Sequence, residues 1–553
     1  MPSPLERCLR CGFRESDISS VWIPPHALVE GQDVFNCLRS GNSSFDIDVT
    51  ALDEDITLQE KTVSDLNHRL KHLDALISRI RKERAKTAKN LAAKRSLLSP
   101  IRRLNRDVLL HIFSYVSDWK FNHNNTSSSL DVKNAPWIFL RVCHWWRLIA
   151  SSSPALWSTV SLVKVFPSFL PPHALDIVRS QLQLSRDSPL KLLLYCDNPD
   201  GVNEEPLIKE LVSHSSRWFS VYIRAFAPVL RQLSAVLETR NLSELKTLTL
   251  EGFRQWEFDS NVFFDAPNLT SLRLDYSCRV LPSMFPTSNL SQFRGSFYDG
   301  AEFRNFISAA PRLEVLWVQV ISGRQSSSAN QPAPIPITLH HLRQLSYLRS
   351  SETCTEYLTV PALRILSATQ SSANNINAIA ALYDRSRFSL DQLYLCRSCT
   401  CFAAAAHFFE TDAVRHLMHL HLEVDTSSAS DWITALTVTS SSCVLPNLSD
   451  LTVMALIFDD SGLTDPDQAR RFLDMARSRL PDRAGVNSSL KSCLKNIKLL
   501  LWEPFDARDI YIDGFKALRE GGLDANFHFS VSDVTRNWLW HIGPMICSGI
   551  ELF

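Results

Sequence analysis

The most regular alternation of hydrophobic and polar positions along the chain lies between residues 52 and 80. Apolar side chains recur there at spacings of three and four residues, which is the heptad pattern of a helix with one apolar seam. Position a of the heptad holds Ile56, Val63, Leu70 and Ile77, and position d holds Leu66, Leu73 and Ile80. The next seam positions hold Arg84, Thr87 and Lys94, so the apolar seam ends at Ile80. The pattern predicts a long helix over residues 51–99, which Pro100 ends.

A helix with an apolar seam must bury that seam, because an isolated helix is only marginally stable in water. Residues 52–80 can do so as a coiled coil, by self-association or with another protein, or as an amphipathic helix packed within the same chain. The sequence leaves both possibilities open. Residues 1–50, which precede the helix, carry several prolines and glycines among polar residues and predict a loosely structured segment.

A second pattern, of the form Leu-x-x-Leu-x-Leu, recurs within residues 161–553. Its first leucine falls at Leu245, Leu269, Leu313, Leu390, Leu417 and Leu448, and weaker copies begin at Leu290, Leu342, Leu363 and Leu494. Most neighbouring copies are about 21 to 31 residues apart, which resembles the spacing of leucine-rich repeats. The resemblance implies an irregular leucine-rich-repeat solenoid over residues 161–553 and, for the whole chain, an α/β fold.

The alternation of side chains along a strand explains why such a repeat needs leucines at these positions. The second and third leucines of each copy point into the core. The residue between these two points to the other face of a shared sheet. One copy cannot bury its own apolar face, whereas stacked copies can. The outward residues, which are candidates for binding a target protein, are Thr249, Arg273, Trp317, Tyr394, His421 and Thr452. In the long gap before Leu494, the sequence Asp465-Pro-Asp-Gln predicts the capped start of a helix that continues to Leu480.

Two motifs lie within residues 100–160. The first runs Pro100-Ile-Arg-Arg-Leu-Asn-Arg-Asp-Val-Leu-Leu-His-Ile-Phe113 and resembles the start of an F-box, whose usual pattern is Leu-Pro-x-Glu-x-Leu-x-x-Ile-Phe. Asn105 replaces the usual proline and Asp107 the usual glutamate, but Asn is a good helix cap and Asp suits a helix N-terminus. The second runs Val142-Cys-His-Trp-Trp-Arg-Leu-Ile-Ala150 and then Pro-Ala-Leu-Trp157, which resembles the second half of an F-box. A polar insertion, Asp118 to Lys133, separates them.

The resemblance to the F-box family implies a helical domain over residues 100–160 that docks on a Skp adaptor and thereby joins a cullin RING ubiquitin ligase. The implied adaptor-binding residues form one apolar face, namely Leu104, Val108, Leu109, Ile112, Phe113, Val116, Val142, Cys143 and Trp146. Positions 108 to 116 of this set share a helical stripe, as expected of a helix bound in a groove. The same stripe would also suit the core of the domain itself. Leu104, Leu109 and Phe113 are the preferred contact residues.

The order of a heptad helix, an F-box and divergent repeats resembles the large F-box families of mushroom-forming (basidiomycete) fungi. Composition agrees with a folded protein, because the 553 residues are 45% hydrophobic and 21% charged. Lys and Arg number 58, as do Asp and Glu, so no net field attracts nucleic acid or an anionic membrane. The sequence has no secretory signal, no apolar run of about 18 residues, and 13 scattered cysteines. We therefore expect a cytoplasmic or nuclear protein with reduced thiols that pack as small hydrophobic side chains.

Weaker signals suggest no further chemistry. Residues 79–106 hold eleven Lys and Arg against Glu83 alone, but lack aromatic residues that could stack on bases, so a solvated helix face is favoured over specific nucleic-acid binding. Cys8 with Cys11, and Cys396 with Cys399 and Cys401, each lack a clear second half of a four-ligand zinc site. Cys37 and His26 could complete the first set in principle, but packing as small apolar side chains is favoured. No phosphate loop, nucleophile elbow, zincin or dinucleotide motif occurs. We expect no enzyme activity, no cofactor and no metal.

These patterns predict the substrate-receptor subunit of a Skp/cullin/F-box type ubiquitin ligase. The F-box would dock the adaptor and the leucine-rich repeats would bind an unknown target protein, while separate subunits perform ubiquitin transfer. The chain would then contribute proximity. Two alternatives stay open. One is an F-box and leucine-rich-repeat interaction scaffold outside any ligase, and the other is a repeat protein with an enzymatic or nucleic-acid-binding site that carries no recognisable motif.

Overall fold

The computed structural model describes the following residues: 39, 49–117, 128–163, 173–196, 205–237, 241–252, 256–257, 266–274, 278–279, 285–297, 299–320, 335–348, 352–369, 373–398, 402–424, 426–439, 443–455, 463, 465–480, 494–501 and 507–529. The chain divides into two units, Met1–Val108 and Leu109–Phe553. This division crosses the predicted F-box, residues 100–160, and most of the predicted loose segment, residues 1–50, lies outside the described residues.

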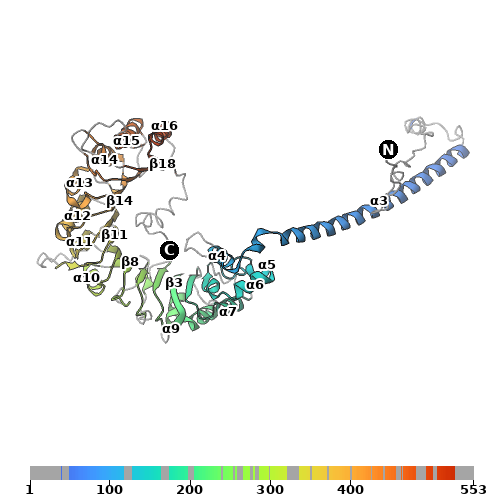
Figure 1. Cartoon of the computed structure of the whole chain (residues 1–553), viewed down its shortest axis with the longest axis horizontal. Helices are drawn as coiled ribbons and strands as arrows, with labels where there is room; N and C mark the ends of the chain where they lie inside the picture. The colour runs from blue at the N-terminus through green and yellow to red at the C-terminus, as the bar shows by residue number, and fades with distance from the viewer. Residues whose placement is uncertain are drawn as a thin grey trace. The chain divides into compact units, whose positions relative to one another are not determined.

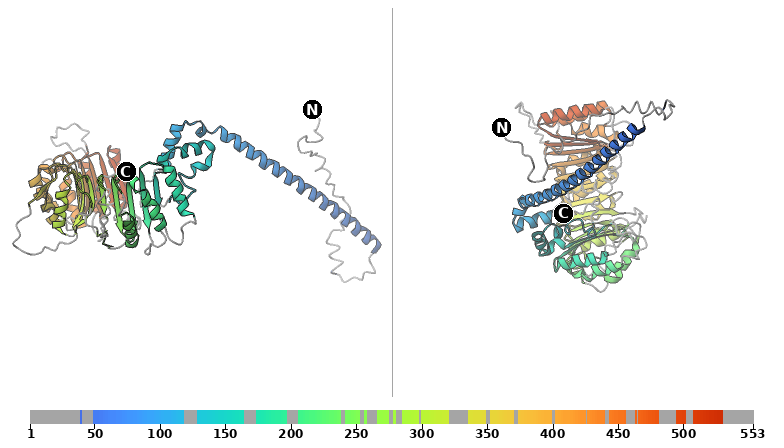
Figure 2. Two further views of the ribbon diagram at one scale, coloured as in Figure 1. Left: turned by 90° about the horizontal axis from the view of Figure 1, so that it is seen from below. Right: turned by 90° about the vertical axis from the view of Figure 1, so that its right-hand side faces the viewer.

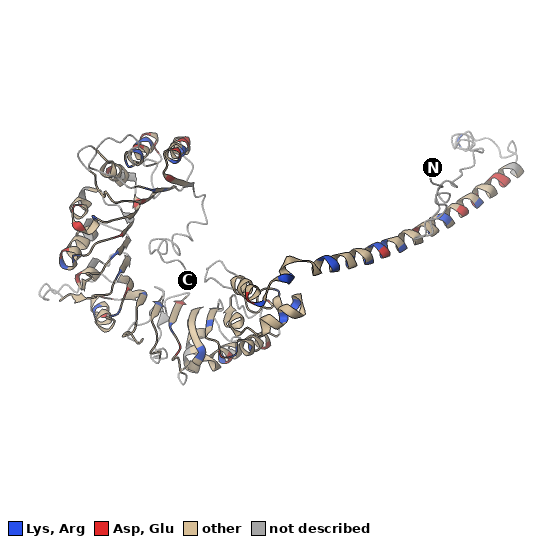
Figure 3. Ribbon diagram, viewed as in Figure 1, with Lys and Arg blue, Asp and Glu red and all other residues tan. Residues whose placement is uncertain are grey.

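The first unit contains one long helix, α3, over Val49–Leu97, followed by a short 3-10 helix over Pro100–Arg103 (Figure 1). These bounds confirm the long helix predicted over residues 51–99. Its seven predicted seam residues are each 42 to 58% exposed, so the chain as described leaves the seam uncovered. The Lys and Arg of α3 gather towards its C-terminal half, as Figure 3 shows.

A small helical module follows, and its first helix begins in the first unit. Its elements are α4 (Arg106–Ser117), α5 (Phe139–Val142), α6 (His144–Ser151) and a 3-10 helix (Pro154–Trp157). The side chain of Asn105 accepts a hydrogen bond from the backbone N–H of Val108 at 2.9 Å, which is the cap predicted for this helix. The Cys143 sulfur accepts from the N–H of Trp146 at 3.5 Å and so caps α6.

A large parallel sheet forms the rest of the described chain. Fourteen strands pair in sequence order, each hydrogen-bonded to the next main strand along the chain. They are β1 (Thr159–Leu162), β2 (Leu190–Cys196), β3 (Trp218–Ala225), β4 (Thr247–Gly252), β6 (Ser271–Leu274), β8 (Gln292–Phe297), β9 (Val315–Val320), β11 (Gln344–Leu348), β13 (Ile365–Thr369), β14 (Gln392–Ser398), β15 (His419–Val424), β16 (Asp450–Ala455), β17 (Asn496–Leu501) and β18 (Asp524–Phe529). Two further parallel pairs join β5 (Trp256–Glu257) to β7 (Cys278–Arg279) and β10 (Ile337–Thr338) to β12 (Leu358–Thr359).

Helices lie along one face of this sheet, and no helix of the described residues covers the other face (Figures 1 and 2). They are α7 (Ala174–Ser185), α8 (Glu205–Ser213), α9 (Ala227–Leu237), α10 (Gly300–Ala309), α11 (Glu352–Glu356), α12 (Ala373–Ser386), α13 (Phe402–Phe409), α14 (Thr426–Leu436), α15 (Pro466–Ser478) and α16 (Arg508–Glu520), with 3-10 turns at Ser215–Arg217 and Asp412–Val414. The molecule is therefore mixed α/β, with a long N-terminal helix and a large parallel sheet.

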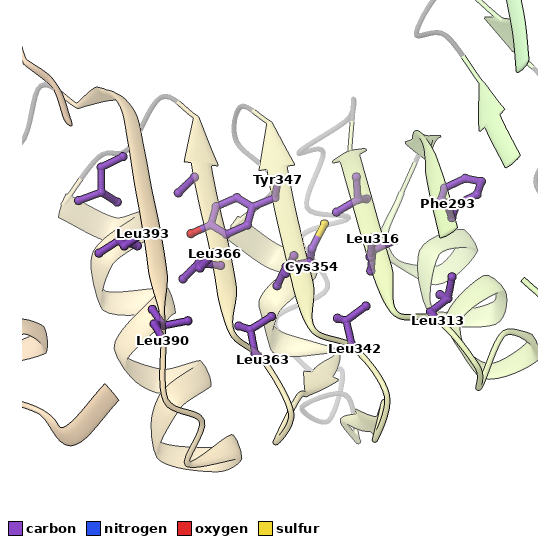
Figure 4. Close-up of a cluster of buried hydrophobic side chains, with 14 of the residues drawn as sticks. Phe293, Leu313, Leu316, Leu342, Tyr347, Cys354, Leu363, Leu366, Leu390 and Leu393 are labelled. Atoms are coloured by element: carbon purple, nitrogen blue, oxygen red, sulfur yellow. The ribbon is translucent and has the colours of Figure 1, made fainter. Parts of the chain in front are cut away.

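The predicted repeat leucines fill the space between sheet and helices (Figure 4). The first leucine of every copy, from Leu245 to Leu494, is at most 2% exposed. The second leucine position forms one buried row across all fourteen strands, made of Val160, Leu192, Val221, Leu248, Leu272, Phe293, Leu316, Leu345, Leu366, Leu393, Leu420, Leu451, Ile497 and Ala525. Each buried leucine contributes on the order of 1.5 to 3 kcal/mol. The predicted inward leucines are thus confirmed.

The turn before each strand is tied to the turn before the preceding strand. The backbone N–H groups of Ser449 and Asp450 both donate to the Met418 carbonyl, and this arrangement repeats from Lys246 to Lys495. Asparagine side chains reinforce it, because Asn268 donates to the Ser243 carbonyl at 2.7 Å and Asn447 to the Arg415 carbonyl at 2.8 Å. Both asparagines belong to Asn-x-Ser/Thr sequences, which here serve strand stacking.

Helix α15 confirms the helix predicted in the long gap before Leu494. The Asp465 carboxylate accepts from the N–H groups of Asp467 and Gln468, both at 3.1 Å, and so caps it. Arg479, at its C-terminus, is fully buried, and burial lowers its pKa. Its guanidinium donates to the carbonyls of Leu436, Val444 and Leu445, so backbone oxygens hold this buried cation.

Replacement of Asn447 by Ala should lower the free energy of unfolding by about 1 kcal/mol, because it removes one hydrogen bond between consecutive turns. Urea unfolding followed by circular dichroism measures this change. Asn447→Asp is the matched control, since it keeps the size of the side chain but loses the N–H donor, and it should be at least as destabilised. Unchanged stability in both variants would contradict the role given to Asn447.

Candidate functional site

Aromatic side chains build the core of the helical module. The Phe113 ring of α4 stacks on Phe139 of α5, with centroids 4.1 Å apart, and lies 4.8 Å from the Trp146 ring of α6. The Trp157 indole N–H donates to the Ala150 carbonyl at 2.8 Å. Both F-box-like motifs therefore meet in one core around Phe113.

The structure corrects the choice of Leu109 and Phe113 as preferred contact residues. Both side chains are 0% exposed. The physical reason is that the inward-facing side chains of α4 pack into the aromatic core of the module itself. These two residues can hold a docking surface in place, but they cannot touch a partner in this conformation.

Other predicted adaptor-binding residues lie at the surface. Val116 is 56% exposed and Val142 is 49% exposed, while Ile112, Cys143 and Trp146 are partly buried. In the first unit, Val108 is exposed and Leu104 is partly buried.

Four exposed apolar side chains of the module were missed by the motif comparison. They are Tyr115, Ile138, Trp145 and Leu148. Together with Val116 and Val142 they are called here the apolar surface of the module. Six exposed apolar side chains in or next to three short helices are typical of an interaction site.

The six outward residues predicted on the sheet all fall in one row. Strand pairing aligns Thr249 with Arg273, Tyr394 with His421, and His421 with Thr452. The complete row on the helix-free face, here called the outward row, is Ser161, Leu193, Tyr222, Thr249, Arg273, Arg294, Trp317, Ser346, Ser367, Tyr394, His421, Thr452, Lys498 and Asn526. The prediction that these residues share one face is confirmed.

Trp317 and His421 were predicted among the outward target-binding candidates, and the structure buries them within this row, at 4% and 6% exposed. Neighbouring side chains from adjacent strands contribute to their cover. The Arg294 guanidinium lies over the Trp317 ring at 4.6 Å, and the Tyr394 ring lies 5.8 Å from the His421 ring. Trp317 Nε1 and His421 Nε2 have no hydrogen-bond partner among the residues that the structure describes.

One hydrogen bond and one ion pair organise the N-terminal part of the same face. The Tyr222 hydroxyl donates to Glu251 at 2.6 Å, and Arg273 lies 3.6 Å from the other oxygen of that carboxylate. Burial, followed by the negative charge of Glu251, raises the pKa of Tyr222, so this phenol keeps its proton. The group is a satisfied structural network and offers no reactive side chain.

A pocket of about 170 Å³ opens on the outward row over β14 to β17. Its wall contains the rings of Tyr394 and His421, with Thr452 and Lys498 beside them. On one side, Asp450 Oδ2 lies 3.1 Å from His419 Nδ1, and Asp450 also accepts a hydrogen bond from the Asn496 amide. Burial lowers the pKa of His421 from 6.5 to about 4, so its ring is neutral at physiological pH.

No group of three or more His, Cys, Asp or Glu among the described residues is placed to hold a metal ion. Cys196 and Cys354 are buried in the core, as expected for packed thiols. Cys8, Cys11, His26, Cys37, Cys399 and Cys401, and most of the Asp118–Lys133 insertion, lie outside the described residues. Across the described helices, none has both the length and the apolar character that a bilayer crossing demands.

Profiles of known protein families give no match to this chain, and neither does a search among curated proteins. The F-box and leucine-rich-repeat resemblances therefore stay predictions from the motifs. The structure contributes the apolar surface of the module and the outward row of the sheet as the two candidate binding sites.

The buried His421 makes folding stability depend on pH. Between pH 6.5 and about 4 the unfolded chain binds a proton on this ring and the folded chain does not, so the free energy of unfolding falls as pH drops through this window. At pH 5 the loss attributable to His421 is roughly 2 kcal/mol relative to neutral pH. Urea unfolding of the wild type and His421→Gln at pH 7.5 and 5.0 measures it. The variant should lose less stability on acidification, and an equal loss would refute the assignment.

Proposed function

We propose that the chain is an F-box type substrate receptor, in which the helical module docks a Skp adaptor and the outward row of the sheet holds a target protein. The observation that carries this proposal is the set of exposed apolar side chains on or next to α4 to α6, in a module whose aromatic core joins Phe113 of the first F-box-like motif to Trp146 of the second. Removal of such side chains from water is the main driving force of protein association.

We also propose that the parallel sheet is a leucine-rich-repeat solenoid. Its support is the strictly sequential pairing of parallel strands and the leucine at equivalent positions of successive units. In such an array each unit buries its apolar face against its neighbours, and the other face of the sheet becomes an extended surface of varied polar residues. That surface suits a protein partner better than a small molecule, because its side chains come from many strands.

Ubiquitin transfer would then be performed by a cullin RING ligase that the adaptor recruits. The contribution of this chain is proximity, since a target held near the transfer machinery presents its lysines at high effective concentration. A cytoplasmic or nuclear location follows from this proposal.

Substitution of two exposed residues tests adaptor docking without disturbing the core. In Val116→Asp/Val142→Asp, each new carboxylate would have to be desolvated against an apolar partner, so adaptor affinity should fall at least tenfold. Purified Skp adaptor and tagged full-length chain, measured by biolayer interferometry, give the affinity. Ser114→Asp/His144→Asp places the same charges at exposed polar positions of α4 and α6 and should bind normally.

Two results would contradict the proposal at different levels. If the Val116/Val142 variant unfolds at the wild-type temperature and binds the adaptor equally well, the apolar surface is not the docking site. If the wild-type chain recovers adaptor but no cullin from cell extract, the interaction scaffold outside a ligase becomes the better description.

We further propose that the exposed seam of α3 pairs with a second copy of the chain. The seam residues are uncovered in the described chain, and coiled-coil pairing would bury them at positions a and d. Leu66→Asp/Leu73→Asp should convert a dimer to a monomer in sedimentation equilibrium, whereas His68→Asp/Ala75→Asp on the opposite side of the helix should stay dimeric. A wild-type chain that is monomeric at micromolar concentration would refute self-association.

A further inference from the structure

The pocket over β14 to β17 contains a polar atom that the described chain leaves unsatisfied. His421 Nε2 has no hydrogen-bond partner there, although the side chain is only 6% exposed. A buried polar group without a partner is unfavourable, because it has lost its hydrogen bonds to water. A ligand group that hydrogen-bonds to this nitrogen would offset that loss, so the pocket is built to favour a polar occupant.

The charges around the pocket define the sign of that occupant. The oxygens of Asp450 are engaged within the chain, because His419 Nδ1 lies 3.1 Å from one carboxylate oxygen and the Asn496 amide donates to the other. The hydroxyl of Ser449 also bonds to this carboxylate. Lys498, in contrast, is exposed and has no ion-pair partner in the described part of the chain. Lys498 is therefore the charged side chain of the pocket that is left to pair with a ligand, and its charge favours an anionic group.

The strand register places His421 and Lys498 on either side of Thr452. His421, Thr452 and Lys498 are consecutive members of the outward row on β15, β16 and β17. Adjacent strands are about 4.8 Å apart, so a group above Thr452 lies one strand from the imidazole and one strand from the base of the lysine side chain. A carboxylate has two acceptor oxygens, which can bond to both at once.

We infer that this pocket binds the acidic side chain, Asp or Glu, of an extended segment of the target protein. The carboxylate accepts from Lys498 Nζ and from the N–H of the neutral His421 ring, while its methylene groups lie against the Tyr394 ring. The volume of about 170 Å³ accommodates one such side chain and excludes a folded domain, so recognition is of a short segment. An amide would leave Lys498 without a counter-charge, and a lysine would be repelled by it.

This inference rests on the proposal that the outward row holds the target, and its test needs no adaptor. Full-length tagged chain is immobilised in buffer of physiological salt and exposed to pools of seven-residue peptides. Each pool has one central residue fixed as Glu, Asp, Gln, Asn or Lys, and the other positions randomised. Retained peptide is quantified by mass spectrometry.

The Glu and Asp pools should be retained about tenfold more than the Gln and Asn pools, since hydrogen bonds to charged groups are worth more than neutral ones. Lys498→Gln should abolish this preference. Lys495→Gln, at an exposed lysine just before β17, is the matched control and should preserve it. His421→Phe, which keeps an aromatic ring and removes the unsatisfied nitrogen, should reduce the preference without lowering the unfolding temperature.

Three outcomes would overturn the inference: equal retention of the acidic and amide pools by the wild type, an acidic preference that survives Lys498→Gln, or equal losses in the two lysine variants. The last would show a general charge effect of the surface. Adaptor docking is read in a separate assay, so a failure of the peptide preference leaves the docking proposal standing, and a failure of docking leaves the peptide result unchanged.

Discussion

The in-register pairing of parallel strands is the constraint on which the rest of the described sheet depends. Each strand is too short to bury its apolar side alone, and stability comes from the leucine row that runs across all fourteen strands. A shift of one residue would exchange the two faces and expose that row. Stacked backbone hydrogen bonds between consecutive turns, with the asparagine side chains, fix the phase at each step. Because side chains alternate between the two faces of a strand, the register that aligns the buried side chains also aligns the outward row.

The sequence predicted the strands wherever leucine spacing was regular, because that spacing reports the period of a strand and the face of each residue. It did not predict β1 to β3, where TVSL, LKLLLYC and WFSVYIRA supply the same buried row without the repeated motif. It assigned His421 and Trp317 to the correct face but not their burial, since Arg294 and Tyr394 come from neighbouring strands that lie 23 and 27 residues away. For the same reason the cover of Leu109 and Phe113 by Phe139 and Trp146 was missed. Periodicity along one element gives the direction of a side chain, and its exposure depends on packing between elements.

Some buried polar groups have hydrogen-bond partners within the described chain, and others do not. Arg479 has three backbone carbonyls, and Tyr222 has a carboxylate that Arg273 also pairs with, so each carries its own compensation. His421 has none among the described residues, and the low pKa that results from burial keeps it neutral. His421 Nε2 shares this state with Trp317 Nε1 of the same row, and it differs in lining a pocket beside Lys498, which is why ligand binding is proposed there.

The same reasoning applies to the apolar side chains of the helical module. Its core is small, and aromatic stacking around Phe113 already fills it, so Val116, Val142, Trp145 and Leu148 have no interior left to enter. Polar residues at these positions would remove exposed apolar area without affecting the core, yet the sequence places valine, tryptophan and leucine there. Exposed apolar area of this kind favours association and aggregation alike unless a partner covers it. The proposed docking on a Skp adaptor would supply that cover, and it would give one chain both an attachment point and a separate sheet face for the proposed target.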